Sequence, residues 1–174
     1  MRWGILALGL LAVSGASSGP DGSFGAVFFP DPAVEILTPA FQKSKGFSSE
    51  EEVTQWFDQA STRFPGASVQ RVKLGTTPRG RILGAFTIRS SNSVANPVRI
   101  WVQGALHGDE QATPDGVMHL VEMVLSDPEL ANRVELMVVP IANPDGYALA
   151  MRQSASGMDL NRDMMMRQGA ENQM

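Results

Sequence analysis

The sequence predicts an α/β fold in which helices cover a mixed central sheet. Three observations support this prediction: a strand–helix–strand succession over residues 98–104, 114–125 and 134–141, a near-continuous apolar run in the last of these strands, and a β-hairpin before the first. A crossover helix between two strands lets them lie parallel in one sheet with the helix on its face. The hairpin adds an antiparallel pair, which makes the predicted sheet mixed.

Residues 1–16 have the pattern of a signal peptide. Arg2 precedes an apolar run over residues 3–13, and residues 14–16 are small enough for cleavage after Ala16. The run is about half as long as the ~20 residues that a membrane-spanning helix needs. Since the chain has no cysteine for lipid attachment, we expect a secreted or periplasmic protein with no stable membrane anchor after cleavage.

Residues 17–47 are rich in glycine, proline and serine, and they predict an irregular leader. The folded domain is expected to span residues 48–174 without a further boundary. A serine at 48 or 49 followed by a glutamate at 51 or 52 is a capping-box pattern. Apolar residues recur beyond it at helical spacing, which predicts a helix over residues 49–63 that ends before Pro65.

The segments that follow alternate between strand and helix patterns. Residues 69–74 and 82–89 predict two strands of a hairpin, joined by a turn over residues 75–80. Residues 98–104 are rich in β-branched and aromatic side chains. Pro114 opens a helix that Asp127 and Pro128 end, and the apolar residues 134–141 predict a strand buried on both faces.

The composition restricts the function classes. A formal net charge of −4 without a clustered basic run argues against a nucleic-acid partner, and the small, dispersed charge gives no sign of an acidic substrate. The absence of cysteine excludes disulfides, thiol nucleophiles and cysteine-based metal sites. A length of 174 residues suits a single domain, while the oligomeric state is not indicated.

Three motifs lie at the carboxyl ends of predicted strands or in the loops after them, where open α/β sheets place their sites. In the first, His107–Gly108–Asp109–Glu110, an imidazole and a carboxylate can converge on zinc, which accepts nitrogen and oxygen ligands. From these residues alone, a His107 that caps the next helix and a solvated Glu110 remain an alternative.

The second motif, at residues 143–147, is Asn-Pro-Asp-Gly-Tyr, and by its local chemistry it predicts a strong turn. The third is Asp159-Leu160-Asn161-Arg162, with Arg152 upstream of it. An amide beside a guanidinium suits a free carboxylate, although a surface cation and a turn residue would explain the pair equally well.

Taken together, in this order and spacing, the three motifs resemble the zinc carboxypeptidase family, which includes carboxypeptidase A and its bacterial relatives. The resemblance runs over about residues 49–163 and includes the Gly-x-Thr-x-Arg-Gly-Arg turn at residues 75–81. It implies the fold of that family and a zinc-dependent metallocarboxypeptidase that removes C-terminal residues from peptides or proteins.

The resemblance also implies roles for individual residues. His107 and Glu110 match the first two zinc ligands, and Asp159 matches a carboxylate that orients the ligating imidazole from behind. Arg152 matches the arginine that polarises the scissile carbonyl and stabilises the oxyanion.

Asn161 and Arg162 match the pair that holds the C-terminal carboxylate of the substrate. Side-chain specificity is not indicated, because the residues that determine it in the family lie farther along the chain.

The family pattern is incomplete in this sequence. Its third ligand, a histidine, and its general base, a glutamate, lie downstream of the motifs quoted, so we expect an inactive N-terminal fragment of the catalytic domain. The other histidine, His119, lies inside the predicted helix and is expected to be exposed or packed on that helix, and not to be a zinc ligand. Residues 164–166 are three methionines where many relatives have an aromatic residue and a proline; they are more typical of flexible packing than of a copper site.

Two alternatives stay open. The first is a relative with another substrate, either a deacylase or an enzyme that cleaves peptidoglycan peptides. The turn at residues 143–147 and the Asn161–Arg162 pair favour a carboxypeptidase over a deacylase, but they do not separate peptide from peptidoglycan. The second is a non-catalytic zinc-binding or structural protein that ends at residue 174.

Overall fold

The structure, a computed structural model, describes residues 35–173, so the signal peptide and most of the leader predicted from the sequence lie outside the described residues. Four strands form one sheet in the order β1-β2-β4-β3. They are β1 (Ala67–Thr76), β2 (Ile82–Ser90), β3 (Val98–Gln103) and β4 (Val134–Val139). β2 pairs antiparallel with β1 and β4, whereas β3 and β4 are parallel. The prediction of a mixed α/β fold is confirmed.

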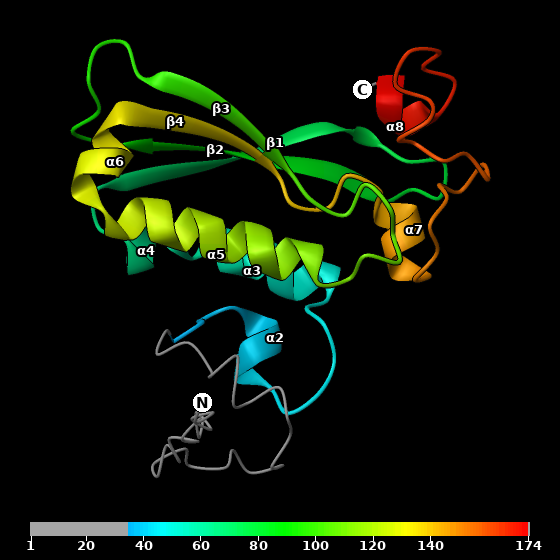
Figure 1. Ribbon diagram of the computed structural model, residues 1–174, viewed down its shortest axis with the longest axis horizontal. Helices are drawn as coiled ribbons and strands as arrows, with labels where there is room; N and C mark the ends of the chain where they lie inside the picture. Colours follow the sequence, from blue (N-terminus) through cyan, green and yellow to red (C-terminus); the bar gives the residue numbers. More distant parts are fainter. Residues whose placement is uncertain (1–34, 174) are drawn as a thin grey trace, which may run out of the picture. The chain divides into compact units, whose positions relative to one another are not determined.

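Helices lie along one face of this sheet (Figure 1). The longest is α5 (Thr113–Ser126), which connects β3 to β4 as the predicted crossover, and α3 (Glu50–Asp58) lies beside it. Together with β2 and β4 they enclose the main core, in which Phe57 stacks on Phe86 with ring centroids 4.4 Å apart. Both side chains are almost fully buried, and burial of such aromatic surface contributes ~2–3 kcal/mol each.

The predicted helix over residues 49–63 is present but divided. Its capping box forms as expected: Ser49 Oγ accepts from the Glu52 N–H at 3.2 Å, and the Glu52 carboxylate accepts from the Ser49 N–H at 2.7 Å. The backbone then turns at Gln59, after which α4 (Ala60–Arg63) begins.

The short helices that flank the predicted elements, α6 (Pro128–Arg133) and α2 (Pro39–Gln42), were not predicted. Asp127 and Pro128 end α5, as expected, but Asp127 also accepts hydrogen bonds from two following N–H groups and so caps α6. A cap residue followed by proline is a start signal as well as a stop signal. Likewise, α2 lies inside the predicted irregular leader, where it forms a single turn.

Strand β4 is buried on its helix-covered face, where Val134, Leu136 and Val138 join the core. Its opposite face is only partly buried at Glu135 and Met137, but Val139 on that face is buried in a second cluster with Leu83 and Ala85. The prediction of burial on both faces is therefore confirmed for the C-terminal end of the strand and wrong for its first half. The neighbouring β3 forms a sheet edge, and its Trp101 is 56% exposed.

Two further helices, α7 (Pro144–Ala148) and α8 (Ala170–Gln173), follow β4. Among residues 35–173, no helix combines the length and the apolar character that a membrane span requires.

Candidate metal centre and active site

The loops that follow β3 and β4 leave the sheet at the same edge, because these two strands are parallel. Backbone hydrogen bonds continue the pairing beyond the strands: the Ala142 N–H donates to Gly104 O at 2.9 Å, and the Asn143 N–H donates to Ala105 O at 3.0 Å. The His107 loop and the Asn143 turn, 36 residues apart by their motif positions, are therefore held side by side.

Gly108 lies directly against the backbone of α7. A Cβ at this position would stand 2.0 Å from the carbonyl carbon of Gly146 and 2.3 Å from the amide nitrogen of Tyr147. The φ angle of Gly108 is not in the left-handed region, so lack of space, and not backbone conformation, requires glycine here. The two sequence motifs thus pack backbone to backbone.

Asn143 organises the second motif. The side-chain carbonyl of this buried residue accepts from the Gly146 N–H at 2.9 Å and caps α7, so the predicted turn is a one-turn helix. Its amide nitrogen donates to the backbone carbonyl of Arg152 at 3.4 Å. Asn143 therefore connects the start of α7 to the predicted catalytic arginine, a contact that sequence reasoning missed.

Asp145 connects α7 to the β1–β2 turn. Its carboxylate is buried and accepts from Thr77 Oγ1 at 2.9 Å and from the Arg79 N–H at 3.3 Å. Arg81 Nε lies 3.7 Å from Oδ1 of Asp145. The turn and the second motif, which the sequence offered only as separate parts of a family pattern, are thus one polar network.

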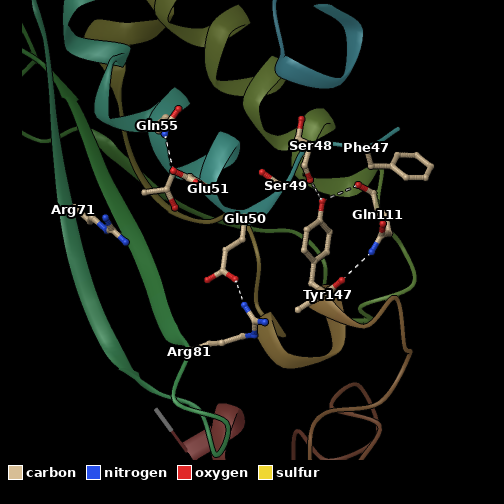
Figure 2. Close-up of a pocket in the computed structure, with 12 residues that line it drawn as sticks. Phe47, Ser48, Ser49, Glu50, Glu51, Gln55, Arg71, Arg81, Gln111 and Tyr147 are labelled. Carbon is tan, nitrogen blue, oxygen red and sulfur yellow. Dashed lines mark hydrogen bonds and ion pairs between the residues drawn. The ribbon is translucent and has the colours of Figure 1, made fainter. Parts of the chain in front are cut away.

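Tyr147 connects α7 to the residues that precede α3 and α5. Its hydroxyl donates to Ser48 O at 2.5 Å and approaches Gln111 O at 3.3 Å, while the Gln111 amide donates back to Tyr147 O at 2.9 Å (Figure 2). Burial raises the pKa of the Tyr147 hydroxyl to about 12, and the charges of Asp115 and Glu52 add to that shift.

A cavity of about 810 Å³ lies beside Tyr147, between α3 and the hairpin, with Glu50, Arg71 and Arg81 among its lining residues (Figure 2). Within the part of the chain that the structure describes, none of the six predicted site residues lines this cavity.

His107 stands between two carboxylates. Its Nδ1 is 2.8 Å from Glu110 Oε1, and its Nε2 is 3.2 Å from Asp159 Oδ1. The histidine is 7% exposed, whereas the side chain of Glu110 is 51% exposed. The residues predicted as two metal ligands and an orienting carboxylate are therefore in contact with one another.

Arg152 joins the same cluster through Asp159. Its Nε donates to Asp159 Oδ2 at 3.1 Å, and the Asn161 N–H donates to Asp159 Oδ1 at 3.0 Å. Desolvation alone would raise the pKa of the Asp159 carboxyl, but the hydrogen bonds from His107 and Arg152 outweigh it and lower that pKa below its ordinary value. Asp159 is thus an ionised bridge between the imidazole and the guanidinium.

The side chains of Asn161 and Arg162 make no hydrogen bond to His107, Asp159 or Arg152 among the described residues. Both residues are exposed, and among the described residues the Arg162 side chain makes no hydrogen bond. Their loop is anchored on either side, by the fully buried Leu160 and by Asp163. The Asp163 carboxylate accepts from the N–H of Gln168 at 2.8 Å, which lowers the pKa of Asp163, and from other donors in residues 169–172.

The donor set fits part of a zinc site. Glu110 and Asp159 face opposite nitrogens of the imidazole, so they cannot bind one ion together, and residues 35–173 hold no group of three possible ligands. His119 lies apart, with its Nδ1 3.3 Å from Glu122 Oε2, as expected for a histidine packed on its helix. One imidazole nitrogen and one carboxylate are suitable zinc donors, but a catalytic zinc has three protein ligands.

Comparison with known proteins identifies relatives over most of the domain. A family model described as zinc carboxypeptidase matches residues 53–172. Carboxypeptidase 2 of Trichophyton rubrum is 34% identical over 82 residues, which cover 42% of this chain and 15% of that protein.

Solved structures give the same result. A metallo-carboxypeptidase from Burkholderia cenocepacia is similar with a TM-score of 0.57 and 27% identity, over 72% of this chain and 36% of that one. Carboxypeptidase A from Helicoverpa armigera is similar with a TM-score of 0.58 and 25% identity, over 74% and 38%. The chain thus spans well under half the length of these relatives.

Proposed function

Because the chain belongs to the zinc carboxypeptidase family, we propose that it contributes part of the active site of a metallocarboxypeptidase that removes C-terminal residues from peptides or proteins. One observation carries the proposal: a single buried imidazole contacts Glu110 through Nδ1 and Asp159 through Nε2, and Asp159 in turn holds Arg152.

His107 and Glu110 would hold the zinc ion. With zinc bound, Asp159 would accept the proton on Nε2 of His107, which it faces, and this would leave the lone pair of Nδ1 to the ion. That lone pair then faces Glu110 Oε1 at 2.8 Å, an arrangement of two acceptors that a cation stabilises. When bound, zinc supplies a Lewis acid that polarises a carbonyl and acidifies a water molecule.

Arg152 would stabilise negative charge that develops on the scissile carbonyl oxygen. Its Nε is held by Asp159, and its side chain is 39% exposed, which leaves the terminal nitrogens available to a substrate. Preorganised donors of this kind account for ~3–4 kcal/mol of transition-state stabilisation when one is removed. Asn161 and Arg162, which project from the same loop, would bind the substrate's terminal carboxylate.

The third zinc ligand and the general base would lie outside the described residues, because residues 35–173 hold no group of three possible ligands. We therefore expect weak zinc binding and no turnover from this chain by itself. Clear zinc-dependent release of a C-terminal residue from a peptide by the purified 174-residue chain would refute that assignment.

Zinc titration of the chain by calorimetry tests the ligand set directly. We expect His107→Gln to abolish measurable binding and Asp159→Asn to weaken it by ~10–100-fold, as is usual for groups that orient a ligand. His119→Gln is the matched control, since it removes the other imidazole of the chain and should leave binding unchanged. Equal effects of the two histidine substitutions would argue against the site.

We also propose that the protein is exported, on the signal-peptide pattern of residues 1–16. Expression in a secreting host followed by N-terminal sequencing should give a mature chain that begins at Ser17. An intact Met1 on protein recovered from the medium would contradict this.

A further inference from the structure

A second cavity, of about 440 Å³, lies between α2 and the first turns of α5, and we call it the α2–α5 cavity. Apolar side chains form much of its wall, among them Ile36, Phe41 and Phe47, and Asp115 also lines it. Its volume is within the range of small-molecule sites. No residue of the zinc site lines it in the described part of the chain.

Asp115 is the unusual member of this wall. It is 3% exposed, and its Oδ1 accepts from Ser48 Oγ at 2.7 Å and from the Ala40 N–H at 3.3 Å. Its Oδ2 is buried and has no hydrogen-bond partner among the described residues. A carboxylate oxygen that is removed from water without a partner costs ~1–3 kcal/mol or more.

Other groups offset little of this cost. Asp115 lies in the first turn of α5, so the helix dipole compensates part of its charge. Among the described residues no lysine or arginine pairs with it, and His119, which also lines the cavity, has its Nδ1 beside Glu122. The α2–α5 cavity therefore combines an apolar wall with a buried carboxylate oxygen, Oδ2 of Asp115, that has no hydrogen-bond partner among the described residues.

We infer that the α2–α5 cavity binds a small organic ammonium ion with an apolar body. The ammonium group would donate to Asp115 Oδ2, and the body would pack on Phe41 and Phe47, whose ring faces also attract a cation. Oδ2 is closed to solvent in this conformation, so the ligand reaches it when a wall side chain rotates. Phe41, which lines the cavity and is 63% exposed, is the wall side chain that we expect to move.

Calorimetric titration of the full 174-residue chain with n-pentylammonium chloride, 1-pentanol and sodium pentanoate tests this inference. We expect pentylammonium to bind ~10-fold more tightly than the alcohol, since charge-assisted hydrogen bonds are the stronger ones, and pentanoate to bind least. Equal affinity for the ammonium and the alcohol, or no binding of any of the three, would overturn it.

Single substitutions test the contribution of the Asp115 carboxylate and that of the apolar wall separately. Asp115→Asn should remove the preference for pentylammonium and leave pentanol binding unchanged, whereas Glu51→Gln, which removes an exposed carboxylate on α3, should change neither. Phe41→Ala, which removes a 63% exposed side chain, should weaken the binding of both ligands by a similar factor, so the inference stays testable if Asp115→Asn fails to fold.

The source of the ammonium group is tested with Nα-acetyl-lysine methylamide, which presents the same group on a peptide. Weaker binding than pentylammonium supports a small-molecule ligand. Tighter binding would overturn that assignment in favour of a lysine from a protein partner. None of these titrations involves zinc, so their outcome is independent of the proposed carboxypeptidase activity.

Discussion

Gly108→Ala is the substitution whose effect the structure defines most closely. The added methyl group would stand 2.0 Å from the carbonyl carbon of Gly146, whereas ordinary contacts begin at 3.4 Å. The His107 loop and α7 must therefore separate by about 1.4 Å. Both sides of the contact are backbone, so no flexible side chain can yield.

The magnitude follows from this geometry. Overpacking a well-packed interior typically costs ~1–3 kcal/mol, and we expect about 3 kcal/mol for Gly108→Ala because the backbone itself must move. A ligand constellation tolerates displacements of only ~0.5 Å. The neighbouring His107 would therefore move relative to the other groups of the zinc site, and zinc binding should be lost along with stability.

Urea unfolding and zinc calorimetry measure the two effects. Gly116→Ala is the matched control: a Cβ there meets nothing within 4 Å, and the residue lies inside α5. It should stabilise the chain by ~0.5–1 kcal/mol, as alanine does in helices. If Gly108→Ala unfolds within ~0.5 kcal/mol of wild type and binds zinc normally, the close packing of the two motifs is wrong.

Three further substitutions test the support around the site. Tyr147→Phe should cost ~1–3 kcal/mol by leaving the Ser48 carbonyl unpaired. Since the folded hydroxyl keeps its proton to about pH 12 while unfolded tyrosine ionises near ~10, denaturation curves should show the deficit of the variant shrinking between these pH values. Asp163→Asn should expose residues 164–173 to limited proteolysis; because the pKa of Asp163 is lowered, wild type should lose the same protection as the pH falls below ~4. Asn143→Ala should cost at least the ~1 kcal/mol of a helix cap in urea unfolding, and an effect indistinguishable from zero would contradict its role in holding the Arg152 backbone.

Local sequence patterns predicted most of the secondary structure. The serine–glutamate box before α3, the alternation in β1, and the proline at the start of α5 depend on neighbours a few residues apart, and each feature is present. The patterns missed α6 because one residue acts at two helix ends. Asp127 was interpreted as the end of α5, but its side chain also caps the start of α6.

The support of the site was not predictable in this way. Asp145 meets Thr77 across 68 residues, and Tyr147 meets Ser48 across 99. Such contacts depend on how the strands are ordered in the sheet, which no periodicity encodes. The family resemblance supplied the candidate residues around His107, but it gave no reason for the glycine beside it; that reason is the backbone of α7.

The exposed edge strand β3 has a practical consequence for handling this chain. Its outer side has no partner strand within residues 35–173, and Val98, Ile100 and Trp101 are all exposed there. Unpaired edges of this kind recruit strands from neighbouring molecules, so concentrated samples are expected to self-associate and precipitate. Light scattering over a dilution series should therefore precede every titration, and a lysine substituted for Trp101 offers a more soluble background in which to work.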